Sequence, residues 1–220
     1  MKPPEGKEYD RHWTRKNYDQ ARVYAAWQQL REHASETYTD ETLSRETLND
    51  DYQQLFVTMV LDHVEHLLTC IKNKTQPAPM RLLLLGTAGS GKTRAVQTAL
   101  QEIQRILARA GLPFDVDPRA FVRVAAPTGS AAFNLRFHAT TVHRLIHWFT
   151  PPYFKTINND EVLYELQKHL RNTQLIILDE VSMIGRQMMG RIDSRFEQAK
   201  GYQNERNESL GGVSLSLIHI

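Results

Sequence analysis

The chain has 220 residues, of which 41% are hydrophobic and 24% are charged, which are ordinary values for a globular protein. Its 27 basic and 25 acidic residues leave a formal net charge of +2, so overall charge does not indicate a nucleic-acid-binding protein and any basic groove would have to be local. The single cysteine, Cys70, excludes an internal disulfide, and no apolar run approaches the roughly 20 residues of a membrane span.

Residues 1–47 are predicted to form a polar and helical extension. Apolar residues recur at helical spacing between residues 17 and 34, and the Thr-, Ser- and Glu-rich segment 35–46 is typical of a linker. A second helix is predicted over residues 50–71, with Asn49 as its N-cap. The KNKTQPAP segment that follows ends this helix, because its prolines lack the amide hydrogen that a helix needs.

From residue 81 onward, apolar runs alternate with helical patterns. The continuous runs LLLL and LIIL are typical of parallel strands that are covered on both faces. Strands alternating with helices imply an α/β fold, a parallel sheet with right-handed crossovers. The predicted strands are 81–85, 121–126 and 175–178, and the predicted helices are 92–110, 130–136, 142–148, 160–171 and 186–200.

The segment GTAGSGKT joins the first of these strands to the next helix and fits the pattern G-x-x-x-x-G-K-[ST]. Its glycines allow successive backbone amides to point inward as an anion nest, and the helix adds its positive N-terminal end. Lys92 would reach the β and γ phosphates of ATP, and the Thr93 hydroxyl would bind Mg²⁺. A chance glycine-rich turn is the alternative, which the flanking strand and helix disfavour. The predicted nucleotide-binding residues of this loop are Gly86, Thr87, Ala88, Gly89, Ser90, Gly91, Lys92 and Thr93.

Two acidic residues, Asp179 and Glu180, follow the apolar run LIIL. Parallel strands bring their carboxyl ends to one edge of a sheet, so Asp179 is expected to face the Mg²⁺ held by Thr93. Glu180 could orient or deprotonate the attacking water. An acidic turn after a strand is the structural alternative. Lys92, Asp179 and Glu180 are therefore the predicted catalytic residues.

Three segments together resemble the superfamily 1 DNA helicases of the petite-integration-frequency (PIF) type, including their relatives in Helitron-like transposons. They are GTAGSGKT (86–93), AAPTGSAA (125–132) with TTVH (140–143) shortly after it, and LDEVSM (178–183). Their order and approximate spacing also match the family. The resemblance covers residues 48–213 and implies a RecA-like P-loop NTPase domain, which would be the first of two such domains.

The resemblance implies an ATP-driven motor that moves 5′ to 3′ on single-stranded DNA. The family positions that match Pro127, Thr128, Gly129, Thr141 and His143 lie along its DNA-facing side. Amide and hydroxyl groups can hold a phosphate without reading sequence, which suits a translocase. From residue types alone, an ordinary strand-to-helix turn at 127–129 and a packed histidine at 143 remain alternatives.

The family also carries Leu-Asn-x-x-Gln ahead of the phosphate loop, with a glutamine that recognises adenine. Here Leu48 and Asn49 are followed by Tyr52 at that register, and Gln53 comes directly after it. Gln53 is the residue expected to contact the nucleotide.

The end of the chain departs from the family pattern. LGGVSL (210–215) resembles the approach to a strand that ends in Gly-Asp, but the chain continues as SLIHI. The codons that would encode LSLIHI match a sequencing adapter, so residues 214–220 are predicted to be a non-native tail. Residues 213–220 are nevertheless apolar enough to occupy the central position of the sheet, between the two site-bearing strands. The second RecA-like domain, with its arginine finger, is predicted to be missing.

Two other functions stay open at this point. One is a P-loop NTPase of another class that does not act on DNA, and the other is a non-catalytic interaction module that retains the phosphate loop as structure. For the helicase, the expected partners are ATP, Mg²⁺ and single-stranded DNA, with no membrane association and no sign of a homo-oligomer. The expected location is intracellular, in the nucleus or else the mitochondrion, and repair, telomere maintenance, recombination and transposition all remain possible pathways.

Overall fold

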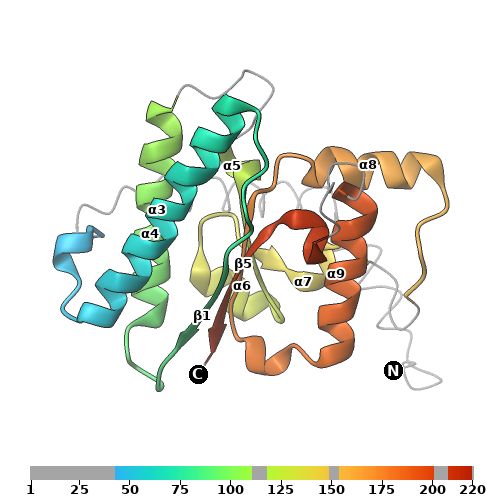
Figure 1. Ribbon diagram of the computed structural model, residues 1–220. Coiled ribbons are helices and arrows are strands. Elements are labelled where there is room, and N and C mark those ends of the chain that lie inside the picture. The colour runs from blue at the N-terminus through green and yellow to red at the C-terminus, as the bar shows by residue number, and fades with distance from the viewer. Residues whose placement is uncertain (1–42, 111–117, 149–153, 201–207, 220) are drawn as a thin grey trace, which may run out of the picture. The chain divides into compact units, whose positions relative to one another are not determined.

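The computed structural model describes residues 43–110, 118–148, 154–200 and 208–219 (Figure 1). The helix predicted over residues 17–34 lies outside the described residues. Leu43 is already buried, and the Gln101 side chain on the second long helix donates a hydrogen bond to its carbonyl at 3.1 Å. Residues 43–47, which the sequence assigns to the extension, therefore pack on the α/β domain.

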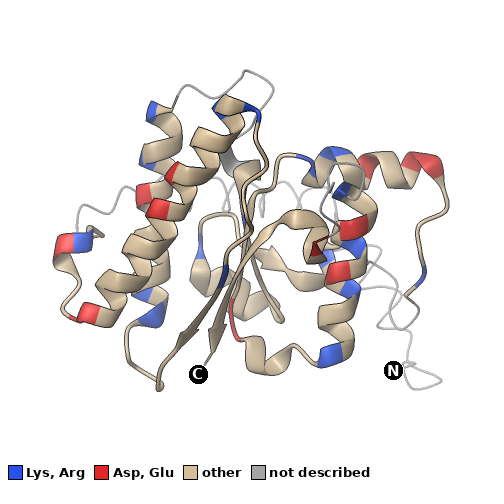
Figure 2. Cartoon of the chain, in the orientation of Figure 1, with Lys and Arg blue, Asp and Glu red and all other residues tan. Residues whose placement is uncertain are grey.

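Within the described residues, five strands form one parallel sheet in the order β1-β5-β4-β2-β3 (Figure 1). This arrangement confirms the predicted α/β fold. The strands are β1 (Arg81–Leu85), β2 (Val122–Ala126), β3 (Thr140–Thr141), β4 (Leu175–Leu178) and β5 (Ser214–His219). They carry few charged side chains, Arg81 on β1 and Arg123 on β2, whereas the helices carry most of the charge (Figure 2).

The last strand, β5, lies between β1 and β4 in the described sheet. Leu83 of β1 is in register with Leu217 of β5, and Leu178 of β4 is in register with the same residue. Because both neighbours of β5 run parallel to it, the carboxyl ends of β1 and β4 emerge at the same edge. The residues after Leu85 and after Leu178 therefore begin on one side of the molecule.

Two long helices, α3 (Asp51–Asn73) and α4 (Lys92–Arg109), pack side by side on one face of the sheet (Figure 1). The N-cap of α3 is Asp50 and not the predicted Asn49. The Asp50 carboxylate accepts hydrogen bonds from the amides of Tyr52 and Gln53 at 2.8 and 3.0 Å. A carboxylate one residue later satisfies the free amides of the first turn and also favours the positive end of the helix.

The other face is covered by α7 (Val142–Leu145), α8 (Asp160–Leu170) and α9 (Arg186–Lys200). Their apolar side chains form a buried cluster with alternate residues of the central strands, including Leu145, Leu166, Leu170, Ile176, Leu178, Ile192 and Phe196. Alternation along β2 and β4 thus supplies one set of side chains to each face.

Shorter elements complete the described structure. They are η1 (Arg45–Thr47), α5 (Pro118–Phe121), α6 (Gly129–Leu135), η2 (Val181–Met183) and η4 (Ser209–Gly212). None of the helices in the described ranges is long and apolar enough to cross a membrane.

One expectation about β1 is wrong. Its apolar run predicts a strand covered on both faces, yet Leu83 is 51% exposed and Leu85 is 60% exposed. In the described sheet β1 is the first strand in the order, with β5 as its neighbour, and this face of it carries no covering helix. Continuous hydrophobicity therefore identified the strand but not its position in the sheet.

Candidate functional site

The phosphate loop joins β1 to α4 at the carboxyl edge of the sheet. Gly89 and Gly91 adopt φ angles of +78° and +76°, which residues with a side chain rarely adopt. Close approach also constrains Gly91, because a Cβ there would lie 2.6 Å from Gln53 Nε2. A Cβ at Gly86 would lie 2.6 Å from Ser90 Oγ. The glycines are thus needed for the shape of this loop.

Lys92 is the first residue of α4, and its side chain is almost fully buried. Its ammonium donates to the carbonyls of Gly86 and Thr87 at 2.7 and 2.6 Å, and to Ser90 Oγ at 3.3 Å. The loop therefore wraps around a buried positive charge. An anion in the loop would offer this ammonium a charged partner in place of neutral carbonyls, which is a stronger interaction.

Gln53, in the first turn of α3, contacts the same loop. Its side-chain amide donates to the carbonyl of Ser90 at 2.7 Å. Gln53 is the third residue of α3, counted from the N-cap Asp50. Tyr52, which occupies the family's glutamine register, is 79% exposed. The Gln53 side chain therefore lies beside the predicted phosphate loop.

Asp179 and Glu180 follow β4 at the same edge as the phosphate loop. Partial burial raises the pKa of the Asp179 carboxyl, and the neighbouring charge of Glu180 adds to the rise. A hydrogen bond from the backbone amide of Glu180 and, to a smaller extent, the positive charge of Lys92 act in the opposite direction and lower this pKa. Glu180 has a left-handed backbone, with φ 51° and ψ 46°, and is the N-cap of η2.

These residues fit a magnesium-bound triphosphate. The nest of Gly86–Gly91, with Lys92, would hold the phosphates, and Thr93, whose side chain is exposed, would share the metal with Asp179. Magnesium supplies charge neutralisation at the phosphates when it is bound. In the described part of the chain, no group of three or more His, Cys, Asp or Glu residues could hold a metal by itself. A magnesium ion needs no such cage, because it is typically bound by one or two protein oxygens plus substrate phosphates.

The two predicted DNA-facing segments lie on adjacent strands. Thr141 of β3 is in register with Ala126, the last residue of β2, which places it next to Pro127. Thr128 and Thr141 have the same local role, since each is an N-cap whose hydroxyl accepts from an amide three residues on, at 3.2 and 3.4 Å. A hydroxyl that accepts from an amide retains its own proton and could donate it to a phosphate.

His143 is half-buried and stacks on another ring. Its imidazole lies 4.8 Å from the Trp148 ring with an interplanar angle of 21°. The guanidinium of Arg191 lies 4.3 Å from the centre of the Trp148 ring. His143 is therefore held by the α7 region and linked through Trp148 to α9, which agrees with the packed histidine and leaves its predicted DNA contact untested.

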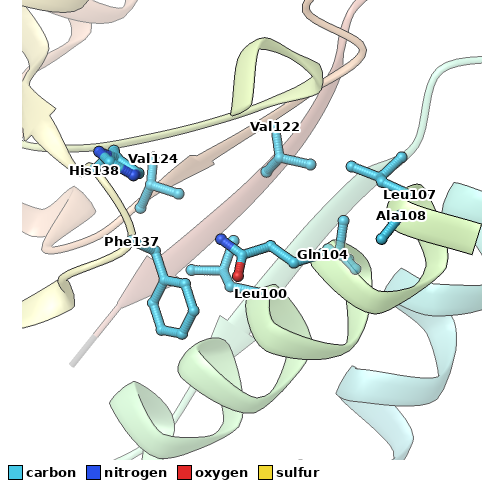
Figure 3. A pocket seen from close by; sticks show the side chains of 9 residues that line it. Leu100, Gln104, Leu107, Ala108, Val122, Val124, Phe137 and His138 are labelled. Carbon is cyan, nitrogen blue, oxygen red and sulfur yellow. The ribbon is translucent and has the colours of Figure 1, made fainter. Parts of the chain in front are cut away.

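An apolar pocket of about 220 Å³ lies between α4 and β2. Figure 3 shows Leu107 and Ala108 at one end of it and Phe137 and His138 at the other. None of the predicted site residues lines this pocket. It occupies the amino-terminal part of β2 and the second half of α4, so it is separate from the phosphate loop.

Sequence reasoning missed several residues that shape the site. The Asp50 cap could have been found from its carboxylate at the start of a helical pattern. The short strand β3 had only two β-branched residues, Thr140 and Thr141, as a signal. The contact of Gln53 with Ser90 and the packing of Arg191 over the Trp148 ring join residues far apart in sequence, so no local pattern could predict them.

The comparisons agree with this architecture. The AAA domain family model matches residues 71–202. The Pif1 helicase from Candida albicans shares 17% identity with the chain and covers 78% of it, with a TM-score of 0.51. The Bacteroides Pif1 helicase in complex with ADP-AlF3 and ssDNA shares 25% identity over 69% of the chain, with a TM-score of 0.44, and unliganded Pif1 from Bacteroides sp shares 24% over 71%, with a TM-score of 0.43.

The chain spans about a third of each of these solved helicase chains, between 30% and 32% of their length. No curated protein matches it. The likeness to the Candida protein concerns the fold, and it confirms the predicted RecA-like P-loop NTPase architecture. Because the family model covers more than half of the sequence and includes the phosphate loop and the Asp179-Glu180 pair, the chain belongs to the AAA domain family.

Proposed function

We propose that the chain contains the first RecA-like motor domain of a PIF-type, ATP-dependent DNA helicase that moves 5′ to 3′ on single-stranded DNA. The observation that carries the proposal is that the phosphate loop and the Asp179-Glu180 pair follow β1 and β4, whose carboxyl ends lie at one edge of the sheet. Two segments that resemble DNA-contacting motifs lie on the next pair of strands, β2 and β3. Nucleotide and DNA would therefore be bound along one side of the domain.

In the proposed reaction, each residue acts at a stated group. Lys92 and the loop amides bind and orient the phosphates, and Asp179 and Thr93 hold the metal. Glu180 takes a proton from the attacking water, since its carboxylate is the second acid at the end of β4. Gln53 positions the loop through Ser90 and is placed to contact the nucleotide.

The motor domain is proposed to comprise residues 48–213, and a second RecA-like domain would complete the nucleotide site. Such a domain would supply an arginine finger, which is worth on the order of 10³ in rate or more. We therefore expect residues 1–220 to bind Mg-ATP weakly, to hydrolyse it very slowly and not to unwind duplex DNA. The predicted non-native origin of residues 214–220 stays a prediction, which the genomic reading frame past Gly212 tests.

The first test is nucleotide binding by Lys92→Ala. Removal of the buried ammonium is expected to weaken Mg-ATP binding at least tenfold, about 1.4 kcal/mol, because the phosphates lose a charged partner. Titration with a fluorescent ATP analogue measures the affinity, and Lys72→Ala, an exposed lysine at the end of α3, serves as the matched control. Unchanged affinity in Lys92→Ala would support the alternative of a module that keeps the loop as structure.

A second test separates a helicase from an NTPase of another class. Single-stranded DNA is expected to bind the chain and to stimulate ATP hydrolysis by the full-length protein. The bound complexes of the Bacteroides helicases contain ssDNA, which supports this choice of ligand. ATP hydrolysis that is indifferent to DNA, together with no measurable DNA binding, would favour the other class.

A further inference from the structure

Phe133 is a large apolar side chain that the described structure leaves in solvent. It lies on α6, the helix that begins at the APTG segment, and it is 77% exposed. Burying a phenylalanine side chain would stabilise the protein by roughly 1.5–3 kcal/mol, so this position forgoes a stabilising contact. Scattered exposed hydrophobic residues are common, and the surroundings of Phe133 decide what this one can do.

The exposed face of α6 contains residues from the predicted DNA-facing segment. Gly129, Ser130, Phe133 and Asn134 are exposed, whereas Ala132 and Leu135 are buried. Residues three and four apart lie on the same side of a helix, so Phe133 is one turn from Gly129 and Ser130. The Phe133 ring and the Gly129–Ser130 turn thus share one surface.

The helix that carries this ring is held firmly in place. At its start, the Thr128 hydroxyl accepts from the amide of Ala131 at 3.2 Å. At its end, the Gln97 side chain of α4 donates to the carbonyl of Asn134 at 3.2 Å. Leu135 is fully buried beneath it. A ring on a fixed helix loses less conformational entropy on binding than a ring on a loose loop.

The chemistry of this surface suits a nucleobase. α6 has the sequence GSAAFNL and so carries no acidic residue that would repel a DNA strand. An aromatic face can stack on any base, which suits a protein that moves along DNA without reading sequence. The hydroxyls of Thr128 and Thr141 on the neighbouring strand ends are proposed phosphate contacts, and a nucleotide's base projects away from its phosphate.

We propose that Phe133 is a base-stacking residue, which receives one base of single-stranded DNA while the Thr128 and Thr141 hydroxyls hold adjacent phosphates. The inference rests on the proposed function, since it assumes that DNA follows this side of the domain. It goes beyond that function by assigning a side chain that touches the bases and not the backbone.

The test measures binding of short oligonucleotides to the full 220-residue chain by fluorescence anisotropy. Phe133→Ala is expected to weaken binding of oligo(dT) about tenfold, because one stacked base is lost. Phe133→Leu, which stays apolar without a π face, should lose a similar factor, and Phe133→Trp should restore binding. With an abasic oligonucleotide of equal length, wild type and Phe133→Ala should bind equally.

Tyr164→Ala is the matched control. Tyr164 is 63% exposed on α8, which leads into the amino end of β4, so its removal should leave DNA affinity unchanged. Equal oligo(dT) affinity of wild type and Phe133→Ala would overturn the stacking role and leave the helicase proposal standing. An equal loss on normal and abasic DNA would also overturn it, because the effect would then not depend on bases. If wild type binds no single-stranded DNA, the proposed function fails, and this inference fails with it.

Discussion

At the scale of single residues, the candidate site consists of charged groups held in unfavourable surroundings. The ammonium of Lys92 is buried among carbonyls, and Asp179 has a raised pKa because its carboxyl is partly removed from water. Glu180 keeps a left-handed backbone that costs a residue with a side chain of order 1–3 kcal/mol. The desolvated Asp179 carboxyl and the left-handed Glu180 backbone weaken the unliganded protein, and a bound metal with its phosphates would offset that cost.

The substitution Asp179→Asn should separate the cost of the charged carboxyl in the unliganded protein from its contribution to Mg-ATP binding. The folded protein raises the pKa of this carboxyl, so the folded state disfavours the charged form, and at neutral pH the charge reduces stability. The neutral amide is expected to stabilise the protein without nucleotide by on the order of 0.5 kcal/mol, a small value because the group is partly solvated. It should also weaken binding of Mg-ATP.

Thermal unfolding with and without Mg-ATP measures both quantities. The variant should gain melting temperature in the absence of ligand and lose most of the ligand-induced increase. The extra stability of Asp179→Asn over wild type should vanish at acid pH, below the ordinary pKa of an aspartate, because the wild-type carboxyl is then protonated in both the folded and the unfolded state. A variant that is less stable at neutral pH would contradict the argument.

At the scale of elements, the turn before β5 is fastened from two sides. Arg81 of β1 donates to the carbonyls of Val213 and Ser209 at 2.7 and 2.9 Å. Asp193 of α9 accepts from the amide of Leu210 at 2.6 Å. Gly211 fits between these contacts with φ 58°, and a Cβ there would lie 2.7 Å from the carbonyl oxygen of Phe196. The turn fixes how β5 enters the sheet between β1 and β4.

Gly211→Ala is therefore expected to destabilise the protein by about 2–4 kcal/mol, since it combines a strained backbone with a clash against helix backbone. Urea unfolding provides the measurement. Gly190→Ala is the matched control, because Gly190 lies within α9 with open space around it. That change should stabilise the helix by about 0.5–1 kcal/mol. Similar effects of the two substitutions would refute the proposed packing of the turn.

At the scale of the whole molecule, stability should depend on pH through a buried lysine. Lys200, at the end of α9, is 4% exposed, and its ammonium donates to the carbonyl of Thr173. Burial lowers the pKa of Lys200 to about 8. Above this pH the folded state has lost a proton that the unfolded chain still binds up to its ordinary pKa near 10.5. The stability of the folded state therefore rises with pH across this window.

The comparison of wild type with Lys200→Met isolates this contribution. The free energy of unfolding of wild type relative to the variant is expected to increase between about pH 8 and pH 10, by as much as about 2 kcal/mol. Urea unfolding curves at several pH values measure the difference. Lys168→Met, at an exposed position on α8, should show no such trend. Parallel pH profiles of wild type and Lys200→Met would mean that the amine is not desolvated in the folded protein.

The local elements and the residue types of the site follow from the amino-acid sequence alone. β1, β4 and α9 have the predicted bounds. In each of them one hydrophobic pattern, that of a strand or of a helix, continues without a break and is flanked by Gly, Pro or polar residues. The phosphate loop and the Asp179-Glu180 pair were found because their chemistry demands particular residues at short spacing. These features depend on residues that are close together in the chain, so they can be recognised from the sequence.

Which residues meet and which are covered depends on how the elements pack together. The exposure of Leu83 and Leu85, the contact of Gln53 with Ser90 and the packing of Arg191 over Trp148 all depend on residues distant in sequence. Burial depends on which elements pack against a strand, and a hydrophobic pattern is the same for an edge strand as for a central one. The exposure of Phe133 also depends on tertiary packing, because the residues around it in the sequence are as compatible with a buried ring as with an exposed one.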